Sequence, residues 1–112
     1  METVNRCAIG IGPRQPLIDW SIRVSGESRL SWGGEDHSLY LIPTYETREQ
    51  AEAFLRESYE RIFCNELESW SLDPETWPSP RSYALFEEWF EVRLFDLIED
   101  LAADQPWHEA MG

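Results

Sequence analysis

The stretch Gly10–Gly12 could begin a phosphate-binding loop, because two glycines follow an apolar run and lead into an expected helix. The third small residue of a dinucleotide fingerprint would fall at position 15, where this chain has Gln15. Pro13 and Pro16 also lack the backbone N–H groups that cradle a phosphate. The stretch therefore predicts a turn from strand to helix at Gly12-Pro13, and not a nucleotide site.

The same turn carries side chains that could bind a small ligand. Arg14 and Gln15 would follow the carboxyl end of a strand, where ligands bind in open α/β arrangements. In this hypothesis Arg14 holds an anion, and Tyr45 or Trp20 stacks against the ligand. The site would span residues 13–20 and 43–45, and it requires Arg14 and Tyr45 to share a pocket.

Two carboxylates stand out because they lie inside apolar stretches. Asp19 follows Leu17-Ile18, and Asp96 lies between two apolar pairs, so we expect both carboxylates to be partly buried. A buried carboxylate usually needs a cationic partner, and Arg6, Arg14 and Arg93 are candidates. A structural ion pair is favoured over a functional acid, so an enzyme that uses Asp19 or Asp96 is the weakest hypothesis.

No motif for metal binding or nucleophilic catalysis is found in the sequence. His37 and His108 lack metal-ligand spacing, and there is no G-x-S-x-G motif. Cys7 and Cys64 stand far apart, which favours small buried hydrophobic side chains over a disulfide or a metal pair. We therefore expect no catalytic residue, no metal and no cofactor.

The charge balance limits the classes of partner. The chain of 112 residues carries 22 Asp and Glu against 9 Lys and Arg, a net charge of -13. Such a charge opposes binding to nucleic acid or to an anionic membrane and favours a basic protein or a cationic ligand. Because the sequence shows neither a signal peptide nor an apolar run of about 20 residues, we expect a cytoplasmic protein.

Tryptophans in loops are further candidates for contacts with a partner. Trp32 lies in a glycine-rich loop, and exposed aromatic side chains are enriched at protein interfaces. Trp77 lies in a proline-rich turn, where we expect it to fold back onto the core. Trp20 lies on the apolar side of the first expected helix.

The elements that would position these residues follow from apolar spacing and from turn residues. Short apolar runs predict strands over residues 4–11 and 38–45, separated by a loop over residues 25–37. Proline at the first turn predicts a short helix from Pro16 to Ser25 before that loop.

A long helix from Thr47 to Trp70 is the clearest element of the chain. Thr47 and Gln50 form a capping box at its start, and apolar residues then recur at helical spacing. Ser79-Pro80 predicts the cap and the first residue of another helix.

The spacing of apolar residues near the C-terminus fits both the period of a helix and the period of a strand. Residues 90–101 can be drawn as a helix or as a strand. Because a two-stranded sheet is marginal, we predict a third strand over residues 91–98. Residues 99–112 would form a fraying tail that is flexible from about residue 102.

Several short motifs are spread over residues 5 to 98. They are Asn5-Arg6, Pro13-Arg14-Gln15-Pro16-Leu17-Ile18-Asp19-Trp20, Tyr40-Leu41-Ile42-Pro43-Thr44-Tyr45, Trp77-Pro78-Ser79-Pro80-Arg81 and Phe86-Glu87-Glu88-Trp89-Phe90. Their combination resembles a group of small bacterial α+β proteins of unknown function. The resemblance implies an α+β fold whose last element is a strand, and it supplies no catalytic residue.

Together these features predict an α+β fold in one domain over residues 1–112. We expect a small three-stranded mixed sheet in the order β-α-β-α-α-β, with the helices packed mainly on one face. The first strand–helix–strand unit would be parallel and right-handed. So small a sheet leaves an edge or a face to protect, and a homodimer would protect it.

The function that fits best is a non-enzymatic acidic binding module of the bacterial cytoplasm that engages a protein partner. The candidate contact residues are Arg14, Gln15, Asp19, Trp20, Trp32 and Tyr45. One alternative is the small-anion or small-ligand site at residues 13–20 and 43–45. Another is an immunity-like inhibitor of a basic nuclease or a nucleic-acid mimic, which requires carboxylates clustered on one face.

Overall fold

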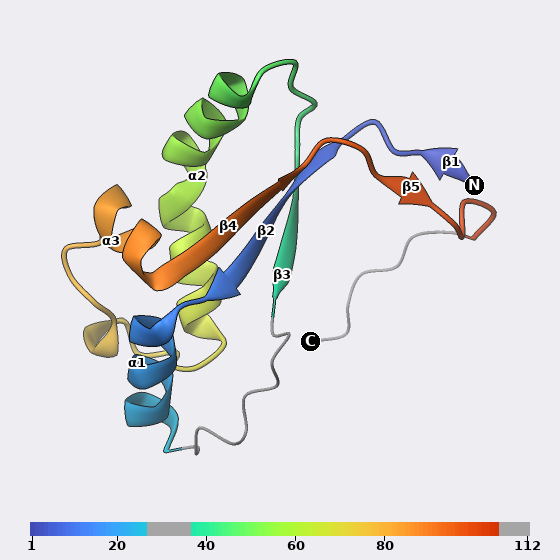
Figure 1. The fold of residues 1–112 in the computed structure, drawn as a ribbon. Helices are drawn as coiled ribbons and strands as arrows, with labels where there is room; N and C mark the ends of the chain where they lie inside the picture. The colour runs from blue at the N-terminus through green and yellow to red at the C-terminus, as the bar shows by residue number, and fades with distance from the viewer. Residues whose placement is uncertain (27–36, 106–112) are drawn as a thin grey trace.

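A three-stranded sheet with helices at its side and at one end forms the body of the protein, as seen in the computed structural model (Figure 1). The structure describes residues 1–26 and 37–105, so the expected loop with Trp32 and the last residues of the expected tail lie outside the described residues. Its elements, in chain order, are β1 (Glu2–Thr3), β2 (Cys7–Pro13), α1 (Gln15–Ser25), β3 (Ser38–Ile42), α2 (Arg48–Glu68), the 3-10 turn Pro74–Thr76, α3 (Tyr83–Trp89), β4 (Phe90–Phe95) and β5 (Glu99–Asp100).

The main sheet has the order β3-β2-β4, and both of its pairings are antiparallel. The α+β class is confirmed, but the predicted parallel pairing of the first two strands is wrong. Helix α1 continues beyond the end of β2 and does not cross back over the sheet (Figure 1). The chain therefore returns on β3 in the opposite direction, with Tyr40 opposite Ile9.

The hydrophobic core lies between one face of the sheet and the helices. Cys7, Ile9 and Ile11 of β2 belong to this core together with side chains from all three α-helices. The ring of Phe63 on α2 lies 5.2 Å from that of Phe90 at the start of β4, and the two rings are nearly perpendicular. The expected placement of the helices on one face therefore agrees with the structure.

The glycines of the suspected phosphate loop lie inside β2, and not in a turn. A Cβ atom on Gly12 would come within 2.3 Å of Nε2 of His37, and one on Gly10 within 2.9 Å of the Phe95 ring. These glycines thus allow side chains on the core-distant face to approach the backbone of the middle strand. The turn predicted at Gly12-Pro13 falls one residue later, because Pro13 still pairs with Phe90.

Local signals place α1 and α2 correctly, but not the start of α3. Helix α1 ends at Gly26, whose left-handed backbone (φ 74°) lets its N–H bond to the carbonyl of Ile22. Helix α2 begins with the predicted capping box of Thr47 and Gln50. The predicted start of α3 at Ser79-Pro80 is wrong, because the hydroxyl of Ser82 caps this helix by accepting the N–H of Leu85.

The predicted C-terminal strand is confirmed as β4, but the expected fraying from residue 99 is wrong. Glu99 and Asp100 form β5, which pairs with β1 near the N-terminus, and the N–H of Val4 donates to the carbonyl of Ile98. This two-stranded ribbon extends from the body of the protein (Figure 1). No helix within the described ranges is both long and apolar enough to cross a membrane.

Candidate partner-binding edge

Strand β3 is an outer strand of the sheet, so within residues 1–26 and 37–105 its backbone pairs with another strand on one side alone. The N–H of Arg14 donates to the carbonyl of Trp89 at 2.9 Å, which extends the pairing of β2 with β4 by one residue. In an antiparallel ladder, successive residues direct their N–H and C=O groups to opposite sides. Even-numbered residues of β2 therefore bond to β4, and odd-numbered residues such as Ile9 bond to β3.

This alternation identifies the groups at the open edge of β3. Tyr40 stands opposite Ile9, so its backbone groups point toward β2. Leu39 and Leu41 must then direct their N–H and C=O groups away from the sheet. Among the described residues, no backbone group bonds to these two edge positions. The described residues therefore leave this edge of β3 unpaired.

The open edge also lacks the charges that usually keep strands apart. No charged residue occurs from Ser38 to Tyr45, although 28% of the chain is charged. The Leu39 side chain is 60% exposed and that of Leu41 is 45% exposed. Soluble domains commonly protect such an edge with charged residues, a proline or a bulge, and here only Pro43 stands just after the strand.

A groove of about 440 Å³ runs between this edge and helix α2. Residues 40–42 of β3 form one wall. The other wall is one stripe of α2 at helical spacing, formed by Phe54, Ser58, Arg61, Ile62 and Asn65. The groove therefore combines apolar side chains with a few polar groups, as binding grooves commonly do.

Hydrogen bonds hold the groove walls together. The Tyr40 hydroxyl donates to a carboxylate oxygen of Glu66 at 2.5 Å and accepts a bond from Nδ2 of Asn65 at 2.8 Å. The Ser38 hydroxyl donates to the other Glu66 oxygen at 3.1 Å. Burial and the Glu66 carboxylate raise the pKa of Tyr40 well above its usual range, so the phenol stays protonated. These bonds fix β3 against α2 and leave the strand edge open.

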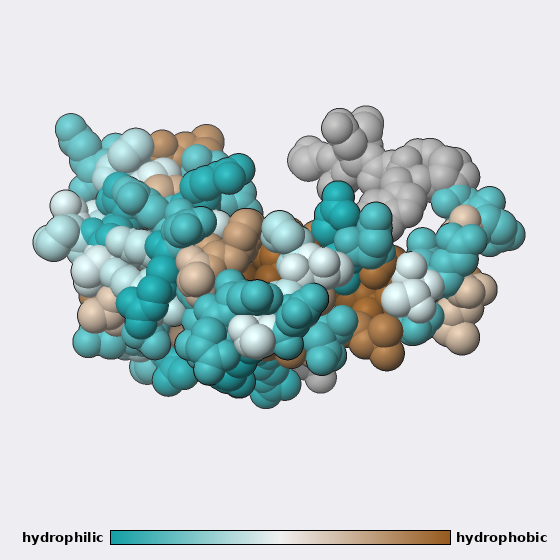
Figure 2. All heavy atoms as spheres, turned by 90° about the horizontal axis from the view of Figure 1, so that it is seen from above, coloured by the Kyte–Doolittle hydropathy of each residue, from teal (hydrophilic) through white to brown (hydrophobic). Residues whose placement is uncertain are grey.

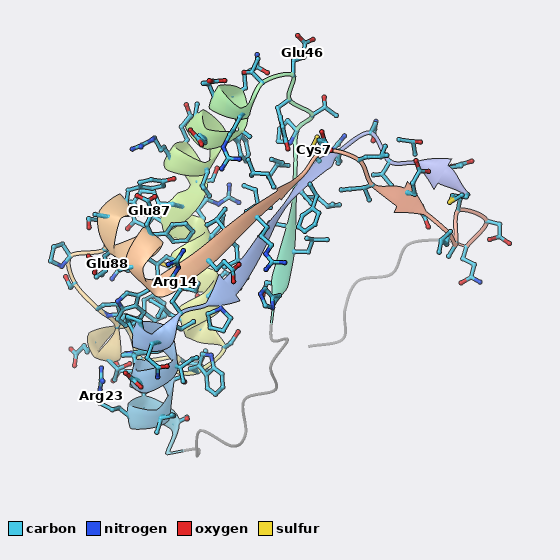
Figure 3. The ribbon with its side chains drawn as sticks, viewed as in Figure 1. Cys7, Arg14, Arg23, Glu46, Glu87 and Glu88 are labelled. Carbon is cyan, nitrogen blue, oxygen red and sulfur yellow. The ribbon has the colours of Figure 1, made fainter. Side chains whose placement is uncertain are left out.

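The structure does not bring the sequence-predicted residues into one site. Arg14 lies at the α1 end of β2, whereas Cys7 marks the other end (Figure 3). Tyr45 lies near Cys7 and Asp96, and burial is the main reason that the pKa of Tyr45 is raised. The shared pocket of Arg14 and Tyr45 that the small-ligand hypothesis requires is therefore not formed.

The other predicted contact residues have structural partners. The side-chain amide of Gln15 donates to Asp19 at 2.8 Å, one turn further along α1. Trp20 is only 3% exposed, and its indole N–H donates to the carbonyl of Thr76. Asp19 is half-buried as expected, whereas Asp96 is exposed, so the expected burial of Asp96 is wrong. Trp32 lies outside the described residues.

A smaller hollow of about 200 Å³ contains Arg14, at the other edge of the sheet. Arg48, Glu52 and Glu87 also line it, and Nε of Arg14 donates to the carbonyl of Phe90. The main role of Arg14 here is thus to bond the backbone at the start of β4. Within the described part of the chain, no group of His, Cys, Asp and Glu is arranged to hold a metal ion.

The carboxylates of the described residues come from several elements of the fold. Glu46 precedes α2, Glu87 and Glu88 lie on α3, and Glu99 lies in the distant ribbon (Figure 3). The space-filling view shows polar surface over much of the molecule and hydrophobic surface between the helical part and the ribbon (Figure 2). The immunity-like alternative, which requires carboxylates clustered on one face, stays a prediction.

The groove residues were not among the sequence-predicted contacts. Arg61, Asn65 and Tyr40 come together only because β3 packs beside α2. One sequence signal did exist, namely the uncharged run from Ser38 to Tyr45 in a highly charged chain. Comparisons with models of protein families, with curated proteins and with solved structures find no match to this chain.

Proposed function

We propose that the protein is a non-enzymatic interaction module that binds an extended segment of a partner protein as an added strand beside β3. The observation that carries this proposal is the open backbone edge at Leu39 and Leu41 next to a groove of about 440 Å³. In strand addition, backbone hydrogen bonds supply affinity, and pockets for alternate side chains supply specificity.

The groove and the strand have matching lengths. The α2 wall extends from Phe54 to Asn65, which is about 16 Å along a helix axis. The five residues of β3 extend over about 17 Å, and residues 40–42 among them line the groove. A bound segment of about five residues would therefore pair along β3 while alternate side chains enter the groove.

A protein segment suits this edge better than the other ligand classes. A net charge of -13 opposes nucleic acid, and the small-ligand hypothesis lacks its pocket. An extended peptide can use both the N–H and C=O groups of the edge and the apolar walls of the groove. The module would thus recognise a partner without chemical turnover.

Selection from a displayed library of random peptides, with the purified protein immobilised, tests this proposal. We expect enriched sequences with apolar residues at alternate positions. Leu39→Pro removes an edge N–H without touching the β2–β3 ladder and should abolish binding of the enriched peptides. Leu39→Ala removes most of the exposed side chain but keeps that N–H, so it should retain most of the binding.

Circular dichroism and thermal unfolding of both variants show whether the fold is intact. If a folded Leu39→Pro variant binds the enriched peptides as well as Leu39→Ala does, strand addition at β3 is wrong. If the wild-type protein enriches no peptide over the empty support, the proposal also fails.

A further inference from the structure

Arg61 gives the groove a single positive charge at an internal position. It lies on the α2 wall after Phe54 and Ser58 and before Asn65. Among the described residues, no carboxylate or carbonyl pairs with its guanidinium. A guanidinium next to apolar walls is suited to bind a carboxylate through two N–H groups.

Neighbouring arginines on the same helix differ from Arg61, because each already has a partner. Arg48 forms an ion pair with Glu52 at 3.0 Å. The guanidinium of Arg56 lies over the ring of Tyr83, 4.4 Å from the ring centre. Arg61 is thus the groove-lining arginine of α2 that remains available to a bound segment.

We infer that the segment bound beside β3 carries an acidic side chain that reaches Arg61, with an apolar side chain two residues away on the side of Phe54. This inference rests on the proposed function. In an extended segment, alternate residues face the same side, about 7 Å apart, so three groove-facing positions fit the groove. The central position meets Arg61, one flanking position lies toward Phe54, and the other lies toward Asn65.

An internal acidic residue fits better than the end of a chain. The groove continues along α2 on both sides of Arg61, toward Phe54 and toward Asn65. A terminal carboxylate at Arg61 would leave part of the groove empty. Because the chain as a whole is strongly acidic, a single carboxylate matched to this arginine is favoured over an acidic run.

A second copy of this chain is a less suitable occupant. Strand β3 contains no carboxylate that could meet Arg61. Pairing of two β3 strands about a two-fold axis would also place the Arg61 residues of both copies in one joined groove, where like charges repel. Sedimentation velocity of the free protein should therefore show a monomer.

Three peptides that differ only at the central position test this inference. They are taken from the selected sequences and carry Glu, Gln or Lys at that position. We expect the wild-type protein to bind the Glu peptide about tenfold more tightly than the Gln peptide, as measured by fluorescence anisotropy. Arg61→Glu should reverse the order so that the Lys peptide binds best.

Arg48→Glu is the matched control. It makes the same change in net charge on the same helix, outside the larger groove, so the preference for the Glu peptide should persist. If all three peptides bind equally but Leu39→Pro abolishes their binding, the inference about Arg61 is wrong and strand addition stands. If Leu39→Pro also leaves peptide binding unchanged, both the inference about Arg61 and the proposal of strand addition are wrong. A dimer that Leu39→Pro dissociates would show that a second copy is the occupant.

Discussion

The two outer strands of the sheet, β3 and β4, pair with the same middle strand but differ in how their free edges are protected. Strand β4 contains Glu91 and Arg93, which form an ion pair at 3.1 Å. Its first carbonyl, that of Phe90, accepts a bond from Arg14, and the Phe90 N–H bonds to Phe86. Strand β3 contains no charged residue.

This difference shows which edge is available to a partner. Charged side chains on an outer strand make pairing with another strand costly, and bonded backbone groups cannot accept one. The hollow beside β4 is small and contains charges of both signs, whereas the groove beside β3 is about twice as large and has Arg61 as its one charged lining residue among those that the structure describes. By the same alternation the backbone groups of Val92 and Leu94 also point outward, so the ion pair and the bonds at Phe90 are what set the β4 edge apart from the β3 edge.

The two outer strands should differ most in how far a substitution to alanine lowers the free energy of unfolding. Phe90 begins β4 and is 1% exposed, in contact with Phe63 and Phe86, so Phe90→Ala should lower the free energy of unfolding by about 3–5 kcal/mol. Leu39→Ala on β3 should cost less than about 1 kcal/mol, because that side chain is mostly exposed. Urea denaturation of both variants measures this contrast, and equal losses would contradict it.

A smaller loss in the free energy of unfolding is expected when a hydrogen bond between β3 and α2 is removed. Tyr40→Phe removes the hydroxyl bonded to Glu66 and Asn65, which should lower the free energy of unfolding by about 1 kcal/mol at neutral pH. Because the native pKa of Tyr40 is raised, its contribution is fully present below the usual tyrosine pKa of about 10. Above that pH the unfolded chain releases the proton first, and the contribution decreases.

The difference in stability between wild type and Tyr40→Phe should therefore shrink as the pH rises above about 10. Guanidinium denaturation at several pH values from about 8 to 11 measures it. A difference that stays constant over this range would mean that the Tyr40 hydroxyl has no raised pKa in the native protein.

An effect of similar size is expected at the β4 edge. Arg14→Ala removes the bond from Nε to the Phe90 carbonyl, which should lower the free energy of unfolding by about 0.5–1.5 kcal/mol. Binding of the selected peptides at β3 should not change. If Arg14→Ala instead abolishes peptide binding and leaves stability unchanged, Arg14 is a contact residue and the comparison of the two edges is wrong.

Local features of the fold were predictable because their causes lie within a few residues. The capping box at Thr47, the apolar spacing that follows it and the stop at Gly26 all depend on neighbours along the chain. The prediction of a C-terminal strand, observed at Phe90–Phe95, rested on a different argument. A sheet of two strands is marginal, so a third strand was needed.

The arrangement of the predicted contact residues was not predictable, for the opposite reason. Arg14, Trp20 and Tyr45 were chosen for their types and for a nearby turn, but bonds to distant backbone groups occupy Arg14 and Trp20. Tyr45 lies at the far end of β2 from Arg14. Such bonds join residues far apart in the chain, so no short motif records them.

The sequence by itself determined the class of fold, the positions of α1 and α2, the acidic charge and the uncharged run that became β3. These properties depend on composition and on short-range spacing. Only the tertiary structure decided the antiparallel direction of β3, the pairing of β1 with β5 and the groove beside α2. Direction and pairing depend on where a helix leads the chain in space, which residue spacing alone does not specify.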